Sequence, residues 1–470
     1  MTEAAVVEGH ALKRKIWGWM AFDWATQPFY TLGLTFIFGP YFATVAAEYY
    51  LGLGLSEQAA DAQAQSLWSL GQTLAGLFIA FTAPLLGAYA DSTGRRMPWL
   101  IGFSVIYVVS AWLLWYMVPD GSALVFGLVA FCFAFVAAEF ALIFTNAILP
   151  SLGDKDEIGK ISGDGAALGY WGGVVSLAIM LLLFFELSEG KTILGNPPPF
   201  GLNGLEREGT RFVGPFIAMW FVIFMIPYWL YVREGVAPNR QGGMSRALQD
   251  LKTSLVNAYQ RKSLFNFLIS SMFYRDALNA LYAFGGVYAA LVLDWTLIQV
   301  AIFGVLGAIT AAIATTIAGR ADRRYGPRPV IHFCIITLMV VCVIIVGMTR
   351  EQVLGIPLAE GSPVPDILFY ICGSIIGGAG GGIYSASRSM MVRHTHPERP
   401  TEAFGLFALS GKATAFLAPG LITLFTWILG DARLGFSPVI FLFLLGYILL
   451  RWVHPEGDSE QWSKEAIPVP

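Results

Sequence analysis

Charged residues are scarce in this sequence. Asp, Glu, Lys and Arg make up 13% of its 470 residues, about half of the roughly 25% that is usual in a soluble domain. Hydrophobic residues make up 56%. The formal net charge of -3 provides no strongly basic surface of the kind that binds nucleic acid. These values exclude an ordinary water-soluble domain, and we expect no nucleic-acid partner.

Cysteine and histidine are also scarce. The four cysteines, Cys132, Cys334, Cys342 and Cys372, lie in apolar runs without paired or CxxC spacing, so they predict neither a disulfide framework nor a metal site. No nucleophile with a nearby base and no nucleotide-binding loop stands out. We therefore expect no cofactor, no metal ion and no enzymatic activity.

Long apolar stretches are abundant. A bilayer core of about 30 Å needs about 20 apolar residues per helix, and such stretches recur along the chain, separated by short polar segments. The predicted membrane spans are 17–47, 64–90, 98–117, 123–149, 163–187, 213–232, 263–290, 297–319, 329–348, 366–391, 403–430 and 436–453. The first begins after Lys13, Arg14 and Lys15 and is longer than the apolar core of a signal peptide. The sequence thus predicts about twelve transmembrane helices.

The basic residues indicate the orientation. If both termini face the cytoplasm, most of the 29 Lys and Arg residues fall in cytoplasmic segments, as the positive-inside rule requires. We therefore predict a multi-pass protein of the cytoplasmic (inner) membrane with both termini in the cytoplasm. The longest cytoplasmic connection, 233–262, is basic and has apolar residues at helical spacing in its second part, which predicts a linker lying along the membrane surface.

The two halves of the sequence resemble each other. The recurring residues are Asp23, Phe29 and Gly33 with Asp276, Tyr282 and Gly286, and then Asn146, Gly163 and Gly169 with Arg388, Gly405 and Gly411. We expect an all-α membrane protein of two pseudo-symmetric six-helix bundles, 1–232 and 263–470, joined by the linker 233–262. In such inverted or parallel repeats the solute site lies where the repeats meet. We expect the protein to be a monomer.

A glycine-rich basic turn follows the second span. Its residues Gly87, Asp91, Gly94, Arg95 and Arg96 resemble the signature loop of the major facilitator superfamily. The glycines allow close helix approach and chain reversal, and Asp91 can cap a helix end. The counterpart after the eighth span keeps the glycine spacing at Gly319 and Gly326, but its acid, Asp322, comes one residue early and Arg323 takes the equivalent position. We predict that both turns act as gating loops.

Ionisable residues inside the spans indicate the candidate site, because each costs roughly 2.5–3.5 kcal/mol at the middle of the bilayer and usually faces a cavity or a partner. The predicted solute or proton site comprises Asp23, Gln27, Glu139, Asn146, Arg275, Asp276, Asn279 and Lys412. Asp23 and Glu139 are candidates for proton coupling or for fixed ion pairs. Arg275 and Asp276 point about 100° apart on a helix, and Arg275 is the candidate clamp for a carboxylate. For Arg388, near the end of the tenth span, we expect its charge to reach the lipid headgroups.

Several short motifs resemble the vacuole effluxer family of autophagy-linked amino-acid permeases and their bacterial relatives. They are Phe22-Asp23-Trp24-Ala25, Thr145 to Pro150, Ile161-Ser162-Gly163, Gly169-Tyr170, Arg388 to Met391 with Pro397, and Phe404 to Lys412. The resemblance extends over nearly the whole chain. It implies the major facilitator fold and efflux or exchange of amino acids.

Together these features predict a secondary transporter that moves a small solute by alternating access, with amino acids as the implied solute class and protons as a candidate coupling ion. One alternative is a carrier of the same superfamily for sugars, peptidoglycan fragments or drugs. An alternative of another class is a membrane receptor or scaffold that does not transport.

Overall fold

The computed structural model describes residues 3–187, 190–233, 261–293, 295, 297–414 and 417–458. Within these ranges the chain is helical apart from loops, two isolated β-bridges and one short antiparallel hairpin, β1 (Gln352–Val353) and β2 (Ile356–Pro357). Nearly all of the predicted linker 233–262 lies outside the described residues. The all-helical fold class is confirmed.

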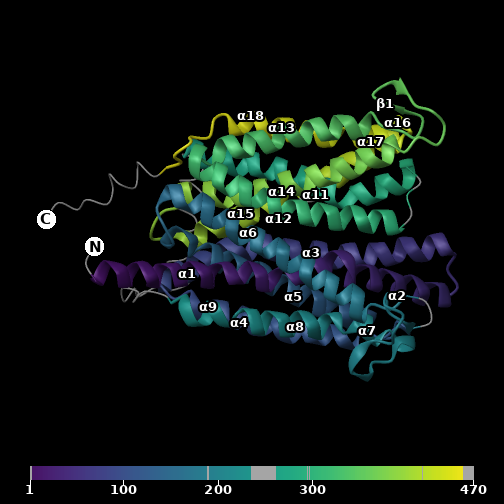
Figure 1. Ribbon diagram of the computed structural model, residues 1–470, viewed down its shortest axis with the longest axis horizontal. Helices are drawn as coiled ribbons and strands as arrows, with labels where there is room; N and C mark the ends of the chain where they lie inside the picture. The colour runs from purple at the N-terminus through teal and green to yellow at the C-terminus, as the bar shows by residue number, and fades with distance from the viewer. Residues whose placement is uncertain are drawn as a thin grey trace. The chain divides into compact units, whose positions relative to one another are not determined.

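The number of spans agrees with the prediction. Eleven helical stretches among the described residues are long and apolar enough to cross a membrane. A further helix, α11 (Lys262–Leu293), has 32 residues and contains the predicted span 263–290. The chain is therefore a multi-pass membrane protein with eleven to twelve spanning helices (Figure 1).

The chain forms two compact units, which we describe separately. Unit 1 comprises Met1–Ile79, Arg95–Thr145 and Leu168–Ala237. Its helices are α1 (Glu3–Pro28), η1 (Phe29–Phe36), α2 (Phe38–Gly52), most of α3 (Glu57–Thr93), α4 (Met97–Leu113), η2 (Leu114–Tyr116), α5 (Leu124–Asn146) without its last residue, the second part of α6 (Lys155–Ile179), η4 (Met180–Phe184), η6 (Pro199–Gly201), η7 (Gly204–Glu206), α7 (Glu208–Arg211), α8 (Val213–Phe224) and α9 (Ile226–Tyr231).

Unit 2 comprises Ala80–Gly94, Asn146–Ala167 and Pro238–Pro470. Its helices are the end of α3, η3 (Leu149–Ser151), the start of α6, α11, α12 (Leu297–Tyr325), α13 (Pro327–Val346), α14 (Val364–His394), α15 (Pro400–Ala413), α16 (Leu417–Leu429), α17 (Ala432–Gly435) and α18 (Pro438–Leu450). Two segments from the first half of the sequence thus pack with the second half. The predicted boundaries at 232 and 263 stay a prediction about the sequence repeat.

Two predicted spans are interrupted. In the first, Pro28 lacks an N–H donor, and a π-helical segment follows in which the Ile37 N–H donates to the Leu32 carbonyl at 3.0 Å. In the eleventh, α15 ends at Ala413, the following Thr414 is not helical, and α16 begins at Leu417, with residues 415 and 416 outside the described ranges. The sequence predicted continuous helices at both places, because its apolar character continues across each break.

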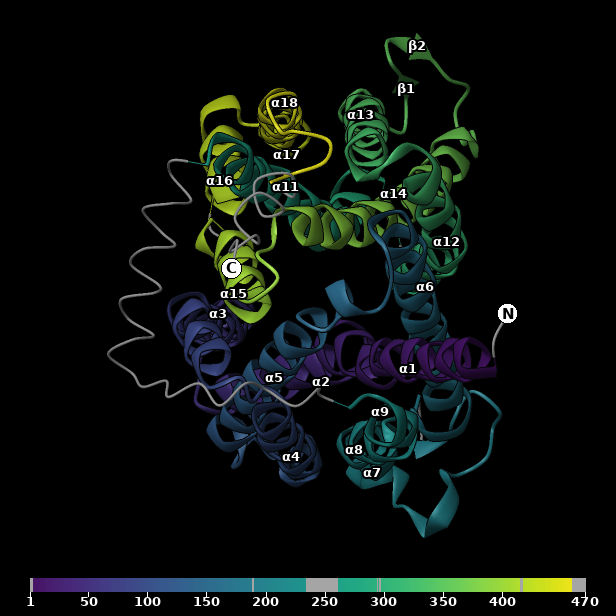
Figure 2. The same ribbon diagram turned by 90° about the vertical axis from the view of Figure 1, so that its left-hand side faces the viewer.

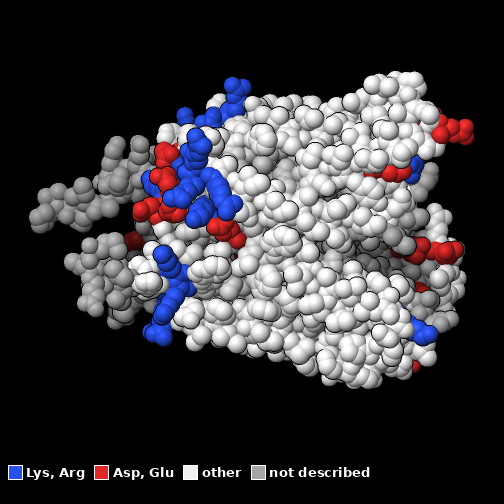
Figure 3. Space-filling view, viewed as in Figure 1, with Lys and Arg blue, Asp and Glu red and all other residues white. Residues whose placement is uncertain are grey.

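The charged side chains on the surface shown in Figure 3 lie near helix ends. In the face shown in Figure 3, Lys, Arg, Asp and Glu gather at the two ends of the helices and the long middle stretches show none. This distribution is the one expected of helices whose middle parts contact lipid, since a charge in the hydrocarbon layer is costly.

Candidate functional site

Five helix ends meet in unit 2, and we call this region the helix-end junction. It consists of the end of α3, the start of α6, and the adjoining ends of α12, α14 and α15. Figure 2 looks along the helices and shows α6 beside α12 and α14, and α3 beside α15. The junction therefore joins segments from both halves of the sequence.

Asp91 connects α3 to α15. Its side chain is 4% exposed, and its Oδ2 accepts a hydrogen bond of 2.8 Å from the main-chain N–H of Glu402, in the first turn of α15. The first N–H groups of a helix have no partner inside the helix, and a carboxylate there also meets the positive end of the helix dipole. Asp91 thus caps the start of α15, and its role in gating stays a prediction.

Glycines allow two close helix contacts in the junction. A Cβ on Gly87 would lie 2.6 Å from the Thr401 carbonyl oxygen, and one on Gly405 would lie 2.7 Å from that of Ala83. A Cβ on Gly163 would lie 2.5 Å from the Cα of Gly319. Real Cβ atoms do not come this close, so only glycine lets these backbones touch.

These contacts follow the sequence repeat. Gly319 is the counterpart of Gly87, and Gly405 is the counterpart of Gly163. The α3–α15 contact in one part of the junction thus corresponds to the α12–α6 contact in the other. The internal similarity of the halves is therefore also a similarity of helix packing.

Arg388 on α14 lies at the centre of the junction and is 1% exposed. Its Nη2 donates to the Ser162 carbonyl at 2.7 Å, its Nε to the Ser162 hydroxyl at 3.1 Å, and its Nη1 to Asn146 Oδ1 at 3.5 Å. The Ser162 hydroxyl in turn donates to the Ser385 carbonyl at 2.8 Å. The prediction that this charge reaches the headgroups is wrong, because the start of α6 covers it and supplies oxygen acceptors.

The turn residues differ in their roles. Gly94 and Gly326 have φ of +65° and +83°, a backbone conformation that favours glycine. Arg95 is exposed and Arg96 is half-buried. In the second turn Arg323 is exposed and forms an ion pair with Glu157 of α6, whereas Asp322 is 1% exposed. Asp322 thus differs from Asp91 in contacts as well as in position.

Unit 1 contains a cluster of polar side chains on α1, η1 and α5. Asp23 is 7% exposed, Gln27 and Glu139 are half-buried, and the Tyr30 hydroxyl donates to Glu139 Oε1 at 3.4 Å. The π-helical segment carries Tyr30. π-Helical segments are uncommon and often mark functional sites.

Glycines of α6 let this helix pack closely against α1 at Asp23 and Gln27. A Cβ on Gly169 would lie 3.2 Å from the Asp23 Cβ, and one on Gly173 would lie 3.1 Å from the Gln27 Cγ. The family-like Gly169-Tyr170 motif is thus explained by helix packing around the acidic residue of α1.

Unit 2 contains a cluster of charged side chains that contact α15 and α16. Arg275 Nη1 donates to the Phe407 carbonyl at 2.9 Å, its guanidinium lies 4.3 Å from the Phe407 ring centre, and it packs against Gly411. Asp276 is 3% exposed and its Oδ2 accepts the Ala418 N–H at 2.9 Å, at the start of α16. Lys412 is half-buried in the last turn of α15 and Asn279 is exposed on α11.

The expected divergence of Arg275 and Asp276 is visible here. One side chain contacts α15 and the other contacts α16, so the two residues hold the two pieces of the interrupted span. Arg275 and Asp276 therefore have structural contacts in addition to the predicted site role.

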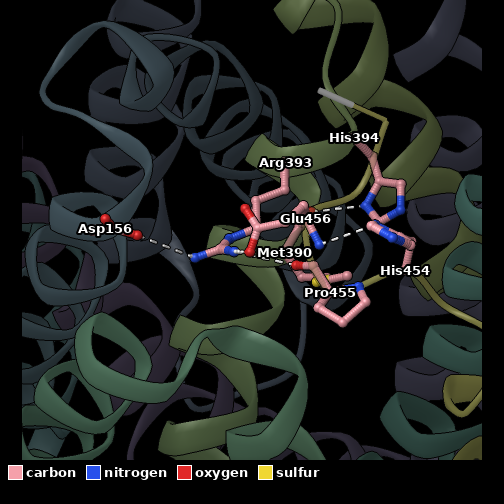
Figure 4. A network of polar contacts seen from close by, with 7 residues as sticks. All are labelled: Asp156, Met390, Arg393, His394, His454, Pro455 and Glu456. Carbon is pink, nitrogen blue, oxygen red and sulfur yellow. Dashed lines mark hydrogen bonds and ion pairs between the residues drawn. The ribbon is translucent and has the colours of Figure 1, made fainter. Parts of the chain in front are cut away.

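The C-terminal segment after α18 contacts the end of α14 (Figure 4). Arg393 Nη1 donates to Glu456 Oε1 at 2.8 Å and to the Pro455 carbonyl at 3.2 Å, and the Asp458 N–H donates to the Arg393 carbonyl at 3.1 Å. Burial raises the pKa of Asp458, while Arg261 and His454 act in the opposite direction. Sequence reasoning missed this contact, since a short polar tail gives no periodic signal.

Among the residues that the structure describes, no group of three or more His, Cys, Asp or Glu side chains could hold a metal ion. Sequence reasoning also missed Ser162, Glu402 and Tyr30 as partners. Ser162 lies within a family-like motif, which could have identified it. The contact of Glu402 with Asp91 uses the main-chain N–H of Glu402, which no side-chain pattern reveals.

Comparison with protein families gives a match over residues 11–461 to the family described as "Vacuole effluxer Atg22 like". A relative from Bacillus subtilis (strain 168), the uncharacterized MFS-type transporter YxiO, is 23% identical over 96% of this chain and 97% of its own length. Autophagy-related protein 22 of Cryptococcus neoformans var. neoformans serotype D is 23% identical over 65% of this chain. The match spans only 53% of that longer protein.

Solved structures of the major facilitator superfamily share the fold. The proton:xylose symporter XylE has a TM-score of 0.66 at 14% identity, over 96% of this chain and 98% of its own. The Escherichia coli fucose:proton symporter FucP has a TM-score of 0.65 at 14% identity, over 94% and 98% of the two chains. These similarities confirm the predicted major facilitator fold.

Proposed function

Because the chain belongs to the Atg22-like vacuole effluxer family of major facilitator transporters, we propose that it moves a small zwitterionic solute of the amino-acid class across the cell membrane by alternating access. The observation that supports this mechanism most directly is the helix-end junction. It joins segments of both sequence halves through glycine contacts and main-chain hydrogen bonds, and such contacts can separate and re-form without leaving a buried hydrophobic core exposed.

The orientation that we propose places the junction on the cytoplasmic side. The turns that carry Arg95, Arg96, Arg323 and Arg324 adjoin it, and basic turns remain in the cytoplasm. Opening of the junction would then give the solute access to the cytoplasm. Closure would be stabilised by Asp91 at α15 and by Arg388 at α6.

The proposed solute class comes from the resemblance to the family, and the charges in the spans support it. Unit 1 supplies Asp23 and Glu139, which are complementary to an ammonium group, and unit 2 supplies Arg275 and Lys412, which are complementary to a carboxylate. An arginine binds a carboxylate well because its planar guanidinium offers two parallel donors. Charges of both signs in the spans suit a zwitterion, whereas a neutral sugar carries no charge that they would complement.

Proton coupling is the second part of the proposal. Asp23 is the first candidate carrier of the proton, since it is a buried carboxylate on α1 close to the π-helical segment. Glu139 is the second candidate, with the Tyr30 hydroxyl on its Oε1. Neutralising the coupling residue should abolish the effect of a proton gradient on transport.

A binding assay in nanodiscs tests the solute class. An intact amino acid should compete with labelled solute at least tenfold better than the matching amine without a carboxylate or the matching acid without an amine. In Arg275→Gln, the amine without a carboxylate should compete as well as the intact amino acid. In Asp23→Asn, the acid without an amine should compete as well as the intact amino acid. Arg433→Gln is the control, because this arginine pairs with Asp431 beside α17.

Competition by neutral sugars and not by amino acids would favour the alternative of a sugar carrier. Binding of every amino acid unchanged in both variants would show that these charges serve packing alone.

A further inference from the structure

Asp322 has an unusual environment for an acid. It lies in the last turn of α12, its side chain is 1% exposed, and neither carboxyl oxygen has a hydrogen-bond partner among the described residues. Buried polar groups in proteins are nearly always hydrogen-bonded. An ionised carboxylate without partners would be very costly here, so the neutral, protonated form is favoured.

Helix α6 closes over this carboxyl group. Gly159 of α6 lies directly against Asp322, and a Cβ on residue 159 would lie 2.8 Å from the Asp322 Cβ. Four residues further along α6, Gly163 touches Gly319 of α12. The contact between α6 and α12 is therefore what removes Asp322 from water.

Arg393 is the charged residue that faces Asp322 from α14, and Ser389 is the nearby hydroxyl. The Ser389 hydroxyl interacts with the Asp322 carboxyl group, but not at the distance and angle of an ordinary hydrogen bond, and the Arg393 Nε has no hydrogen-bond partner among the described residues. The terminal nitrogens of Arg393 are directed to other acids, with Nη1 at 2.8 Å from Glu456 and Nη2 at 4.0 Å from Asp156 of α6 (Figure 4). Asp322 is thus not ion-paired, although a cation is close.

The other ionisable groups around the site have different partners. Arg323, next in sequence, pairs with Glu157 of α6. The buried ring of His394 contacts the Ser263 hydroxyl at 2.8 Å and the Met390 carbonyl at 3.0 Å. Arg320 and Lys160 interact with Asp164 of α6. Among the described residues, the groups that act on the Asp322 carboxyl are therefore Ser389 and Arg393.

We propose that Asp322 is a proton-binding site that is occupied when α6 packs on α12 and emptied when the two helices separate. On closure the carboxylate takes one proton from the solution and an O–H bond forms. On opening, water reaches the group, the bond breaks and the proton returns to the solution. This inference concerns the helix-end junction and is independent of the solute and of the residues assigned to it.

The distance between α6 and α12 as a function of pH tests the proposal. Spin labels are placed at two exposed positions, Lys155 on α6 and Tyr325 on α12, in a chain whose native cysteines are replaced by alanine. Electron–electron double resonance then measures the label separation without added solute. We expect the ratio of closed to open forms to fall with rising pH, by up to tenfold per pH unit, the limit for one proton.

The variant Asp322→Asn replaces the carboxyl by a neutral group of the same shape. It should keep the short distance at every pH. Asp156→Asn and Glu456→Gln are the controls, since each removes an acid that contacts Arg393 and should leave the pH dependence in place. A native chain with the same distances at all pH values would overturn the proposal, and so would pH dependence that survives in Asp322→Asn.

A second variant covers the case in which Asp322→Asn does not fold. Asp322→Glu keeps a titratable group but changes its depth at the contact with Gly159, so the midpoint of the pH response should move. An unchanged midpoint would assign the response to another group and overturn the proposal. Because no solute is present, this outcome is distinct from a failure of the proposed amino-acid transport.

Discussion

Arg388 holds a positive charge in a buried place, where its side chain is 1% exposed. Its hydrogen bonds go to the Ser162 carbonyl, the Ser162 hydroxyl and Asn146. A hydrogen bond to a charged group contributes about 1.5–3 kcal/mol, and a planar guanidinium can direct several donors at once. The stability of the junction therefore depends on arginine itself and not merely on a positive charge.

Arg388→Lys should lower the free energy of unfolding by about 2–3 kcal/mol, because lysine cannot reach Ser162 and Asn146 together. Thermal unfolding of the purified protein in detergent measures the change. Arg324→Lys, at an exposed position of α12, is the matched control and should change stability by less than about 0.5 kcal/mol. Equal effects of the two substitutions would contradict the assigned hydrogen bonds.

The sequence predicted some residue roles and not others. The position of Asp91 after a span and before two arginines suffices to predict a capping role, because the motif and the topology agree. For Arg388 the sequence shows the depth along α14 but not the helix that covers it, so interaction with lipid headgroups was the natural interpretation. Contacts with main-chain atoms, such as that of Asp91 with Glu402, leave no side-chain signal at the accepting or donating partner.

At the scale of elements, the close helix contacts of unit 2 depend on glycine. Gly163 touches the Gly319 backbone, whereas nothing lies within 4 Å of a Cβ placed on Gly76 of α3. Alanine stabilises a helix by roughly 0.5–1 kcal/mol relative to glycine when no clash opposes it. The same substitution should therefore have opposite effects at the two positions.

Gly163→Ala should destabilise the protein by about 1–3 kcal/mol, as overpacking does, and should slow transport by hindering closure. Gly76→Ala should leave stability unchanged or slightly raised. Thermal unfolding and solute flux measured on both variants test these expected effects. A neutral effect of Gly163→Ala would show that α6 and α12 do not come into this contact.

The C-terminal segment provides a pH-dependent element. Because burial raises the pKa of Asp458 in the folded chain, the folded state binds more protons than the unfolded state over the interval above the ordinary carboxyl pKa of about 3.9. The favourable contribution of Asp458 to the free energy of unfolding is therefore lost as pH rises through that interval. At neutral pH the buried, ionised carboxylate destabilises the folded state by its full amount.

Asp458→Asn should raise the midpoint of thermal unfolding at neutral pH and leave it unchanged well below the ordinary carboxyl pKa. Glu351→Gln, at an exposed loop position, is the control. The same increase at both pH values would attribute the effect to something other than ionisation of Asp458.

The element boundaries show the limits of sequence reasoning. The number and order of spans follow from apolar length alone. The π-helical segment after Pro28 and the end of α15 at Ala413 do not, because both lie inside continuous apolar runs. They depend on tertiary partners such as Asp276, whose carboxylate holds the start of α16.

At the scale of the whole molecule, the duplicated sequence corresponds to a duplicated packing rule. Glycines of α6 and α15 at equivalent positions each receive a helix from the other half of the sequence within unit 2. Such an arrangement suits alternating access, in which one end of the protein opens as the other closes. It supports the proposal of a solute carrier and leaves the receptor alternative without a structural feature in its favour.

The most direct test is solute flux into proteoliposomes. The native chain is supplied with a labelled amino-acid mixture, with and without an imposed pH gradient, and is compared with Asp23→Asn. We expect flux that the gradient accelerates in the native chain and no longer accelerates in the variant. An absence of flux for every amino acid under both conditions, with the protein folded and inserted, would contradict it.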